Sequence, residues 1–164
     1  VAEYGYINDW DTSEVTDMSS LFDTYSIMEA AAFNDDISSW DTSSVTSTAY
    51  MFNGARAFQQ NIASWNVSSV TDFEFMFGAC ENFNAPIGNW DVSSVTNMAF
   101  AFVGAKSFNQ PLDLWDVSNV EFFNGMFFGA HTFNQPLCNN WDTSKATTLA
   151  SMFFDAQEFN QDIS

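Results

Sequence analysis

Basic residues are scarce in this chain of 164 residues. Three Lys and Arg stand against 21 Asp and Glu, which gives a formal net charge of −18. Nucleic acids and anionic membrane surfaces bind proteins through clustered positive charge, so neither is an expected partner. Cations, basic proteins and polar glycans remain compatible with so acidic a surface.

Long apolar runs, cysteine and histidine are also lacking. No apolar run approaches the roughly 18 residues that a transmembrane helix requires, so no membrane span is predicted. Cys80 and Cys138 follow their own tryptophans at different distances, and we expect no disulfide between them. His131 is the only histidine and leaves any serine or cysteine nucleophile with at most one candidate base. We therefore predict no enzyme activity, no catalytic residue and no organic cofactor.

Aromatic residues are abundant instead, and they recur at a regular period. Hydrophobic residues make up 46% of the chain and aromatic residues 18%, far more than a disordered chain carries. The spacings between successive tryptophans are 30, 25, 25, 25 and 26 residues. The tryptophans are Trp10, Trp40, Trp65, Trp90, Trp115 and Trp141. A period of this length indicates a repeat architecture, in which each unit buries its apolar face against its neighbours.

The repeat divides the chain without a break. We predict a single repeat domain over residues 1–164, in which residues 1–9 are the end of a preceding repeat. The full repeats are 10–39, 40–64, 65–89, 90–114, 115–140 and 141–164. The first repeat holds about five extra residues within 24–31, which are expected to form a loop on one face of the stack.

Each repeat is predicted to contain one short parallel strand and one short helix. Residues 87–92 have the apolar spacing of the strand in a leucine-rich repeat. Residues 95–105 follow the three-and-four spacing of a helix face, with Ser93 as N-cap and Gly104 near the end. The predicted fold is therefore α/β, a leucine-rich-repeat-like right-handed solenoid of six repeats with uncapped ends. One tryptophan column and two phenylalanine columns are expected to form its core.

The repeat has the pattern W-D-[TV]-S-x-V-T-x-M-x-x-M-F-x-G-A-x-x-F-N-Q-P-[IL]. This pattern closely resembles the repeat of BspA-like surface proteins, which occur in bacteria and protists. The segments 109–111 and 134–136 match its Asn-Gln-Pro element, whereas Gln59, Glu121 and Ala146 depart from it. The resemblance implies an extracellular or cell-surface location and a role in adhesion or protein interaction rather than catalysis.

An acidic column directly follows the tryptophans. Its members are Asp11, Asp41, Asp91, Asp116 and Asp142, with Asn66 in the third repeat. If the tryptophans point inward along a strand, these side chains point outward. One interpretation is an Asx turn, or a hydrogen bond to backbone N–H groups at the start of the helix. The other is a row of carboxylates that binds calcium weakly, since this cation requires several oxygen ligands.

Three further polar patterns are candidates for function. The asparagine column is predicted to be an amide ladder that satisfies backbone groups of neighbouring turns. A serine lies two residues after each member of the acidic column. Because it recurs in all six repeats, a capping role is favoured over that of a nucleophile. Asn66-Val67-Ser68 forms an N-x-S sequon, and Asn66 is predicted to carry a glycan if the source is eukaryotic. The asparagine column comprises Asn34, Asn84, Asn109, Asn134 and Asn160, with Gln59.

The two ends of the repeat array lack polar caps. Core-like residues continue to both ends of the sequence, and exposed apolar ends of a repeat stack mark association sites. The residues predicted to take part in self-association are Tyr4, Tyr6, Ile7, Trp10, Phe153, Phe159 and Ile163.

These patterns lead to one main hypothesis and two alternatives. The main hypothesis is a non-enzymatic extracellular structural protein that associates head to tail into a fibre or surface layer. Its partner is then another copy, or the neighbouring repeats of a longer chain. The first alternative is an adhesion module that presents the acidic strand face to a host protein or glycan. The second is a calcium-stabilised spacer.

Overall fold

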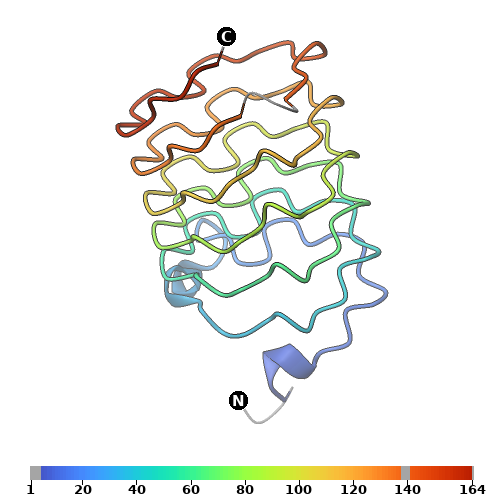
Figure 1. The fold of residues 1–164 in the computed structure, drawn as a ribbon. Helices are drawn as coiled ribbons and strands as arrows, with labels where there is room; N and C mark the ends of the chain where they lie inside the picture. Colours follow the sequence, from blue (N-terminus) through green and yellow to red (C-terminus); the bar gives the residue numbers. More distant parts are fainter. Residues whose placement is uncertain (1–4, 138–140, 164) are drawn as a thin grey trace.

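The computed structural model describes residues 5–137 and 141–163. The chain winds into turns that lie one upon another, from the N-terminal end to the C-terminal end (Figure 1). Residues one repeat apart in the sequence are therefore neighbours in space. Isolated parallel bridges connect successive turns through Asp17, Ser47, Asp72, Asn97, Phe122 and Thr148.

The predicted α/β class is wrong. Over the described residues the only helices are two short 3-10 helices, η1 (Ile7–Asp9) and η2 (Met28–Ala32), and the bridges between turns do not extend into strands. Neither the strand expected at 87–92 nor the helix expected over 95–105 forms. The predicted leucine-rich-repeat-like fold required that strand and that helix in each repeat, so this prediction is also wrong.

Residues in the left-handed region explain why no helix forms. In the second repeat φ is +60° at Tyr50 and +79° at Gly54, and in the fourth it is +56° at Phe100 and +65° at Gly104. Short turns occupy the space between, as where the Asn53 N–H donates to the Tyr50 carbonyl at 3.1 Å. An α-helix cannot continue through left-handed residues. The three-residue spacing of apolar side chains therefore belongs to a series of turns.

Backbone groups that form no hydrogen bond within their own turn form one with a neighbouring turn. The Phe77 N–H donates to the Ala101 carbonyl at 2.9 Å, and the Phe102 N–H donates to the Met126 carbonyl at 2.9 Å. In this part of the turn, N–H groups point toward the C-terminal end of the stack and carbonyls toward the N-terminal end. Elsewhere in the turn the direction is reversed, as where the Thr71 N–H donates to the Thr46 carbonyl at 2.9 Å. Each turn thus offers both donors and acceptors to its neighbours, as parallel strands do, although the described stack contains no strand.

The predicted aromatic columns form the core. The rings of Trp40 and Trp65 stack with centroids 6.4 Å apart and planes 2° from parallel. Phe52 stacks on Phe77 of the next turn at 5.8 Å and on Phe58 of its own turn at 4.1 Å. The central rings of both phenylalanine columns are almost completely buried, and each ring thus gains apolar burial and stacking together.

A hydrogen bond that the sequence did not reveal connects the tryptophans. The Trp65 indole N–H donates to the Ile37 carbonyl at 3.1 Å, and the Trp90 indole N–H donates to the Ile62 carbonyl at 3.3 Å. The same bond recurs at Trp40, Trp115 and Trp141. Each tryptophan therefore buries a large ring and satisfies its one polar atom in a neighbouring turn.

Replacement of Trp90 by phenylalanine should test this indole ladder. Trp90→Phe leaves the Ile62 carbonyl without its donor inside the core, and we expect a loss of about 1 to 3 kcal/mol in unfolding free energy. Urea denaturation followed by circular dichroism gives the measurement. Trp10→Phe is the control, because Trp10 is 45% exposed and should cost less. Equal losses at both positions would contradict a specific role for the buried indole N–H.

A second aromatic stack lies on the left-handed residues. Tyr50 stacks on Phe75 with centroids 4.9 Å apart, and Phe75 stacks on Phe100 at 4.7 Å. The stack ends at Gly125, where φ is +62° and a Cβ would lie 2.2 Å from Cε1 of Phe100. Glycine at this position adopts the left-handed conformation without strain and leaves the space that the Phe100 ring occupies.

Gly125→Ala should lower the unfolding free energy by about 2 kcal/mol, from left-handed strain together with the clash against Phe100. In a Phe100→Ala background the same substitution should cost less, because only the backbone strain remains. A double-mutant cycle by thermal denaturation measures the difference. Strictly additive losses would show that the ring does not restrict this position.

Candidate functional site

The acidic column forms Asx turns. Asp91 Oδ1 accepts hydrogen bonds from the Ser93 backbone N–H at 3.1 Å and from the Ser93 hydroxyl at 2.6 Å. Asn66 makes the same pair of bonds with Ser68 at 3.1 and 2.7 Å. The backbone bond recurs in Asp11–Ser13, Asp41–Ser43, Asp116–Ser118 and Asp142–Ser144. The Asx-turn interpretation is therefore confirmed, and the serine is its donor rather than the N-cap of a helix.

These hydrogen bonds favour the ionised form of the carboxylates. The Ser13 hydroxyl and then its backbone N–H lower the pKa of Asp11, and for Asp142 the backbone N–H of Ser144 is the larger cause of a lowered pKa. The pKa is lowered by a serine in the same way at Asp41 and Asp116. All four side chains are solvent-exposed, so each retains lone pairs that face water.

The structure does not gather the acidic column into a metal centre. Across residues 5–137 and 141–163, no three His, Cys, Asp or Glu side chains form a group that could hold a metal ion. Asn66 also interrupts the column between Asp41 and Asp91. Calcium binding by Asp11, Asp41, Asp91, Asp116 and Asp142 stays a prediction.

Two substitutions of Asp91 should separate the turn from the charge. Asp91→Asn keeps the acceptor that Asn66 uses naturally, so its melting temperature should stay close to that of the parent protein. Asp91→Ala removes the acceptor and should lower the melting temperature by a few degrees. Differential scanning calorimetry with and without a chelator gives the comparison. A loss in the Asn variant equal to that in Ala, together with destabilisation by the chelator, would favour the cation interpretation.

The asparagine column is an amide ladder, as predicted. Asn109 Oδ1 accepts the Asn134 backbone N–H at 2.9 Å and the Gln135 side-chain amide at 3.0 Å. Asn134 Oδ1 accepts the Asn160 N–H at 2.9 Å in the next turn. Asn160 is the last member, and no donor of a following turn reaches it within the described chain. The ladder thus adds a polar contact along the stack direction.

The remaining predicted residues lie at isolated positions. Asn66 is exposed, and its glycosylation stays a prediction. Cys80 is a buried free cysteine whose thiol pKa is raised by burial, so it is packing and not a nucleophile. Cys138 lies outside the described residues. His131 Nε2 lies 3.2 Å from Asp155 Oδ2 at the surface, with no nucleophile in this contact.

The C-terminal end of the stack exposes residues whose counterparts in earlier turns are buried. Phe153 and Phe159 are partly exposed, whereas Phe127 and Phe133, one turn earlier, are fully buried. Leu149 is 48% exposed, and the residues of the same column in the earlier turns are all buried. The end holds a groove of about 310 Å³, lined by Leu137, Trp141, Thr143, Leu149, Met152, Phe153 and Ile163.

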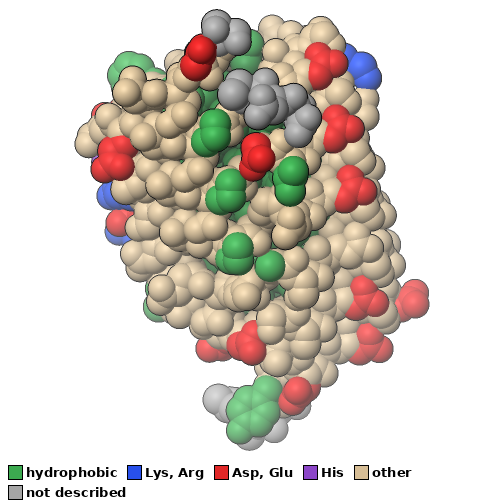
Figure 2. Space-filling view, in the orientation of Figure 1, with side chains coloured by type: hydrophobic (Ala, Val, Ile, Leu, Met, Phe, Trp, Pro, Cys, Tyr) green, Lys and Arg blue, Asp and Glu red, His purple; other side chains and the backbone are tan. Residues whose placement is uncertain are grey.

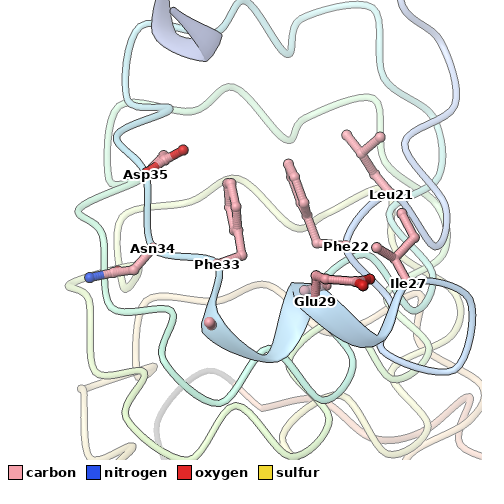
Figure 3. A pocket seen from close by; sticks show the side chains of 9 residues that line it. Leu21, Phe22, Ile27, Glu29, Phe33, Asn34 and Asp35 are labelled. Carbon is pink, nitrogen blue, oxygen red and sulfur yellow. The ribbon is translucent and has the colours of Figure 1, made fainter. Parts of the chain in front are cut away.

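The N-terminal end holds a second apolar depression. The side chains of Leu21, Phe22 and Phe33 point to the same side of the first turn (Figure 3). They line a depression of about 370 Å³, together with Ile27, Glu29, Ala30, Ala32, Asn34 and Asp35. Part of its wall is η2, which belongs to the extra residues of the first repeat. This end therefore differs in shape from the C-terminal end, although both expose core columns.

Of the predicted self-association residues, most lie at these ends. Tyr6 and Trp10 are exposed at the N-terminal end, and Ile163 is 66% exposed at the other. Ile7 is partly buried against the hydrophobic core, and its carbonyl accepts the Trp40 indole N–H. Tyr4 lies outside the described residues. Four further residues of the ends were not predicted, although their positions in the repeat columns could have identified them: Leu21, Phe22, Leu149 and Met152.

The ends also differ in their free backbone groups. At the C-terminal end, the N–H groups of Leu149, Ser151, Phe153 and Asp155 donate to no acceptor within the described residues, although their counterparts one turn earlier donate to the last turn. At the N-terminal end, the carbonyls of Asp17, Ser19 and Leu21 accept no hydrogen bond from the described chain. In this stretch of the turn, the C-terminal end thus presents donors and the N-terminal end presents acceptors.

Charged side chains occupy the flanks of the stack. Acidic groups follow one edge of the molecule, with a basic group at the upper end of that edge, and other basic groups lie beside acidic groups at the opposite edge (Figure 2). Glu81 Oε1 lies 3.3 Å from Lys106 Nζ and 3.7 Å from Arg56 Nε. These ion pairs are exposed and each contributes little stability. They do not assemble a catalytic or cofactor site.

Comparisons with known proteins identify a family. A family model described as Mycoplasma protein of unknown function, DUF285, matches residues 2–94 and again residues 79–164. A search of curated proteins found no match, and a search of solved structures found none either. In the described parts of the chain, no helix has the length and apolar character needed to cross a membrane.

Proposed function

We propose that the protein, which belongs to the DUF285 family of unknown function, is a structural repeat protein without enzyme activity. Its ends associate head to tail and extend the stack into a fibre or surface layer. An extracellular or cell-surface location is part of the proposal and rests on the resemblance of the repeat to BspA-like surface proteins.

The exposure of Leu149 is the observation that carries the proposal. Met18, Phe73, Met98 and Phe123 precede it in the same column, and each is almost completely covered by the following turn. Leu149 lies in an identical position of the last described turn and is 48% exposed. Burial of an apolar side chain of this size contributes about 1.5 to 3 kcal/mol, so the end gains free energy when a further turn covers it.

Net charge opposes this association. Two copies with a formal charge of −18 repel each other, and both terminal turns carry carboxylates, such as Asp11 and Asp142. The Debye length falls from about 10 Å at 0.1 M salt to about 3 Å at 1 M, while apolar burial is not weakened by the added salt. Association should therefore strengthen as the ionic strength rises.

A pair of leucine substitutions tests the proposal. Leu149→Glu places a charge on the C-terminal end and should abolish assembly that the parent protein shows at high concentration and in 0.5 to 1 M salt. Leu114→Glu is the matched control, because Leu114 is 63% exposed on the flank of the stack, and it should leave assembly unchanged. Light scattering after size-exclusion chromatography gives the mass, and negative-stain microscopy shows the particles.

Expected filaments have a subunit repeat of about 29 Å, from six turns at roughly 4.8 Å each. A parent protein that stays monomeric over the whole concentration and salt series would overturn the proposal. Assembly that Leu114→Glu blocks and Leu149→Glu does not would place the contact on the flank and would also overturn it.

A further inference from the structure

We infer that the joint between two copies repeats the internal contact between turns in the same register, so that turn 141–163 of one copy receives the turn that begins at Trp10 of the next. This inference rests on the proposed head-to-tail association and adds its atomic pairing. The chain makes the same contact between turns five times, as its parallel bridges show, so the joint continues an interface that the molecule already contains.

The internal hydrogen bonds define the pairing rule. The Phe123 N–H donates to the Thr148 carbonyl at 3.1 Å, and the Gly125 N–H donates to the Ala150 carbonyl at 2.9 Å. The donor therefore lies eight or ten residues after its tryptophan, and the acceptor seven or nine residues after the next tryptophan. The Met18 N–H follows the same rule when it donates to the Ser47 carbonyl at 3.0 Å.

Applied to the two ends, the rule pairs free donors with free acceptors. The Leu149 N–H meets the Asp17 carbonyl of the second copy, and the Ser151 N–H meets its Ser19 carbonyl. The Phe153 N–H meets its Leu21 carbonyl. This register satisfies the three donors and places the aromatic columns in line. In that alignment Phe22 of the second copy covers Phe153, as Phe153 covers Phe127 at 5.7 Å within the chain.

One segment must give way for the joint to close. Ile163 follows Trp141 by 22 residues, and Ile7 precedes Trp10 by three, so both fill the same place in the repeat column. Ile7 is fixed by the Trp40 indole N–H at 2.8 Å, and the adjacent Asn8 accepts the Ser39 hydroxyl. Ile163 is 66% exposed and lines the groove at the C-terminal end. We therefore assign Ile163 as the residue displaced when Ile7 of the second copy enters.

Engineered cysteines give a direct test of the register. Ser19 and Ser47 lie in adjacent turns with their hydroxyl oxygens 2.7 Å apart. The same column positions across the joint are Ala150 of one copy and Asp17 of the next, and both are exposed. Mixed Ala150→Cys and Asp17→Cys proteins, each carrying Cys80→Ala and Cys138→Ser, should form a disulfide dimer under mild oxidation. Ser19→Cys with Ser47→Cys in one chain is the positive control.

An off-register pair completes the experiment. Ala150→Cys mixed with Glu29→Cys should give at least tenfold less dimer on non-reducing gels. If the proteins assemble but the off-register pair links as fast as Ala150–Asp17, the register is wrong and the proposed function stands. If neither pair links and light scattering shows no assembly, both the register and the proposed function are overturned.

Discussion

Hydrogen bonding between turns is the constraint on which the rest of the structure depends. Left-handed residues at two positions of the second to sixth repeats, such as Phe100 and Gly104, interrupt any helix after a few residues. Their turns leave alternate backbone groups unsatisfied, and burial makes such groups costly unless they find a partner. The neighbouring turn provides that partner, so no turn can be stable by itself. The aromatic columns and the amide ladder follow, because every residue type meets its own counterpart one turn away.

Because each turn depends on its neighbours, turns in the middle of the stack are more stable than turns at its ends. In a repeat array, free energy is approximately the sum of terms within each unit and terms between neighbours. Turns in the middle have two neighbours, whereas the turn from Trp141 has one described neighbour and exposes Leu149 and Phe154. The intrinsic cost of left-handed Ser151 and Asp155 is the same there as elsewhere, but fewer contacts offset it. A terminal turn is consequently stabilised by fewer contacts than a turn in the middle of the described stack.

The aromatic columns could be predicted from the sequence, whereas the backbone conformation of the repeat could not. Tryptophan and phenylalanine recur with the period of the coil, so the pairs Trp40–Trp65 and Phe52–Phe77 could be predicted from spacing alone. Helices could not be distinguished from consecutive turns, because both place an apolar side chain inward about every third residue. The left-handed positions give a mixed signal, since Phe100 occupies the place that Gly125 holds in the next turn. The Asx turns could be predicted, because an Asp or Asn two residues before a Ser is typical of this turn.

The chemistry of the two ends has one further consequence for how the array grows. In the stretch that carries the parallel bridges, Leu149 and Ser151 present N–H donors at the C-terminal end, and Asp17 and Ser19 present carbonyl acceptors at the N-terminal end. A heterologous contact in the internal register satisfies both sets of groups. Heterologous contacts that do not close into a ring continue indefinitely. In the proposed assembly, growth is therefore one-dimensional, and the charge of −18 opposes its first step.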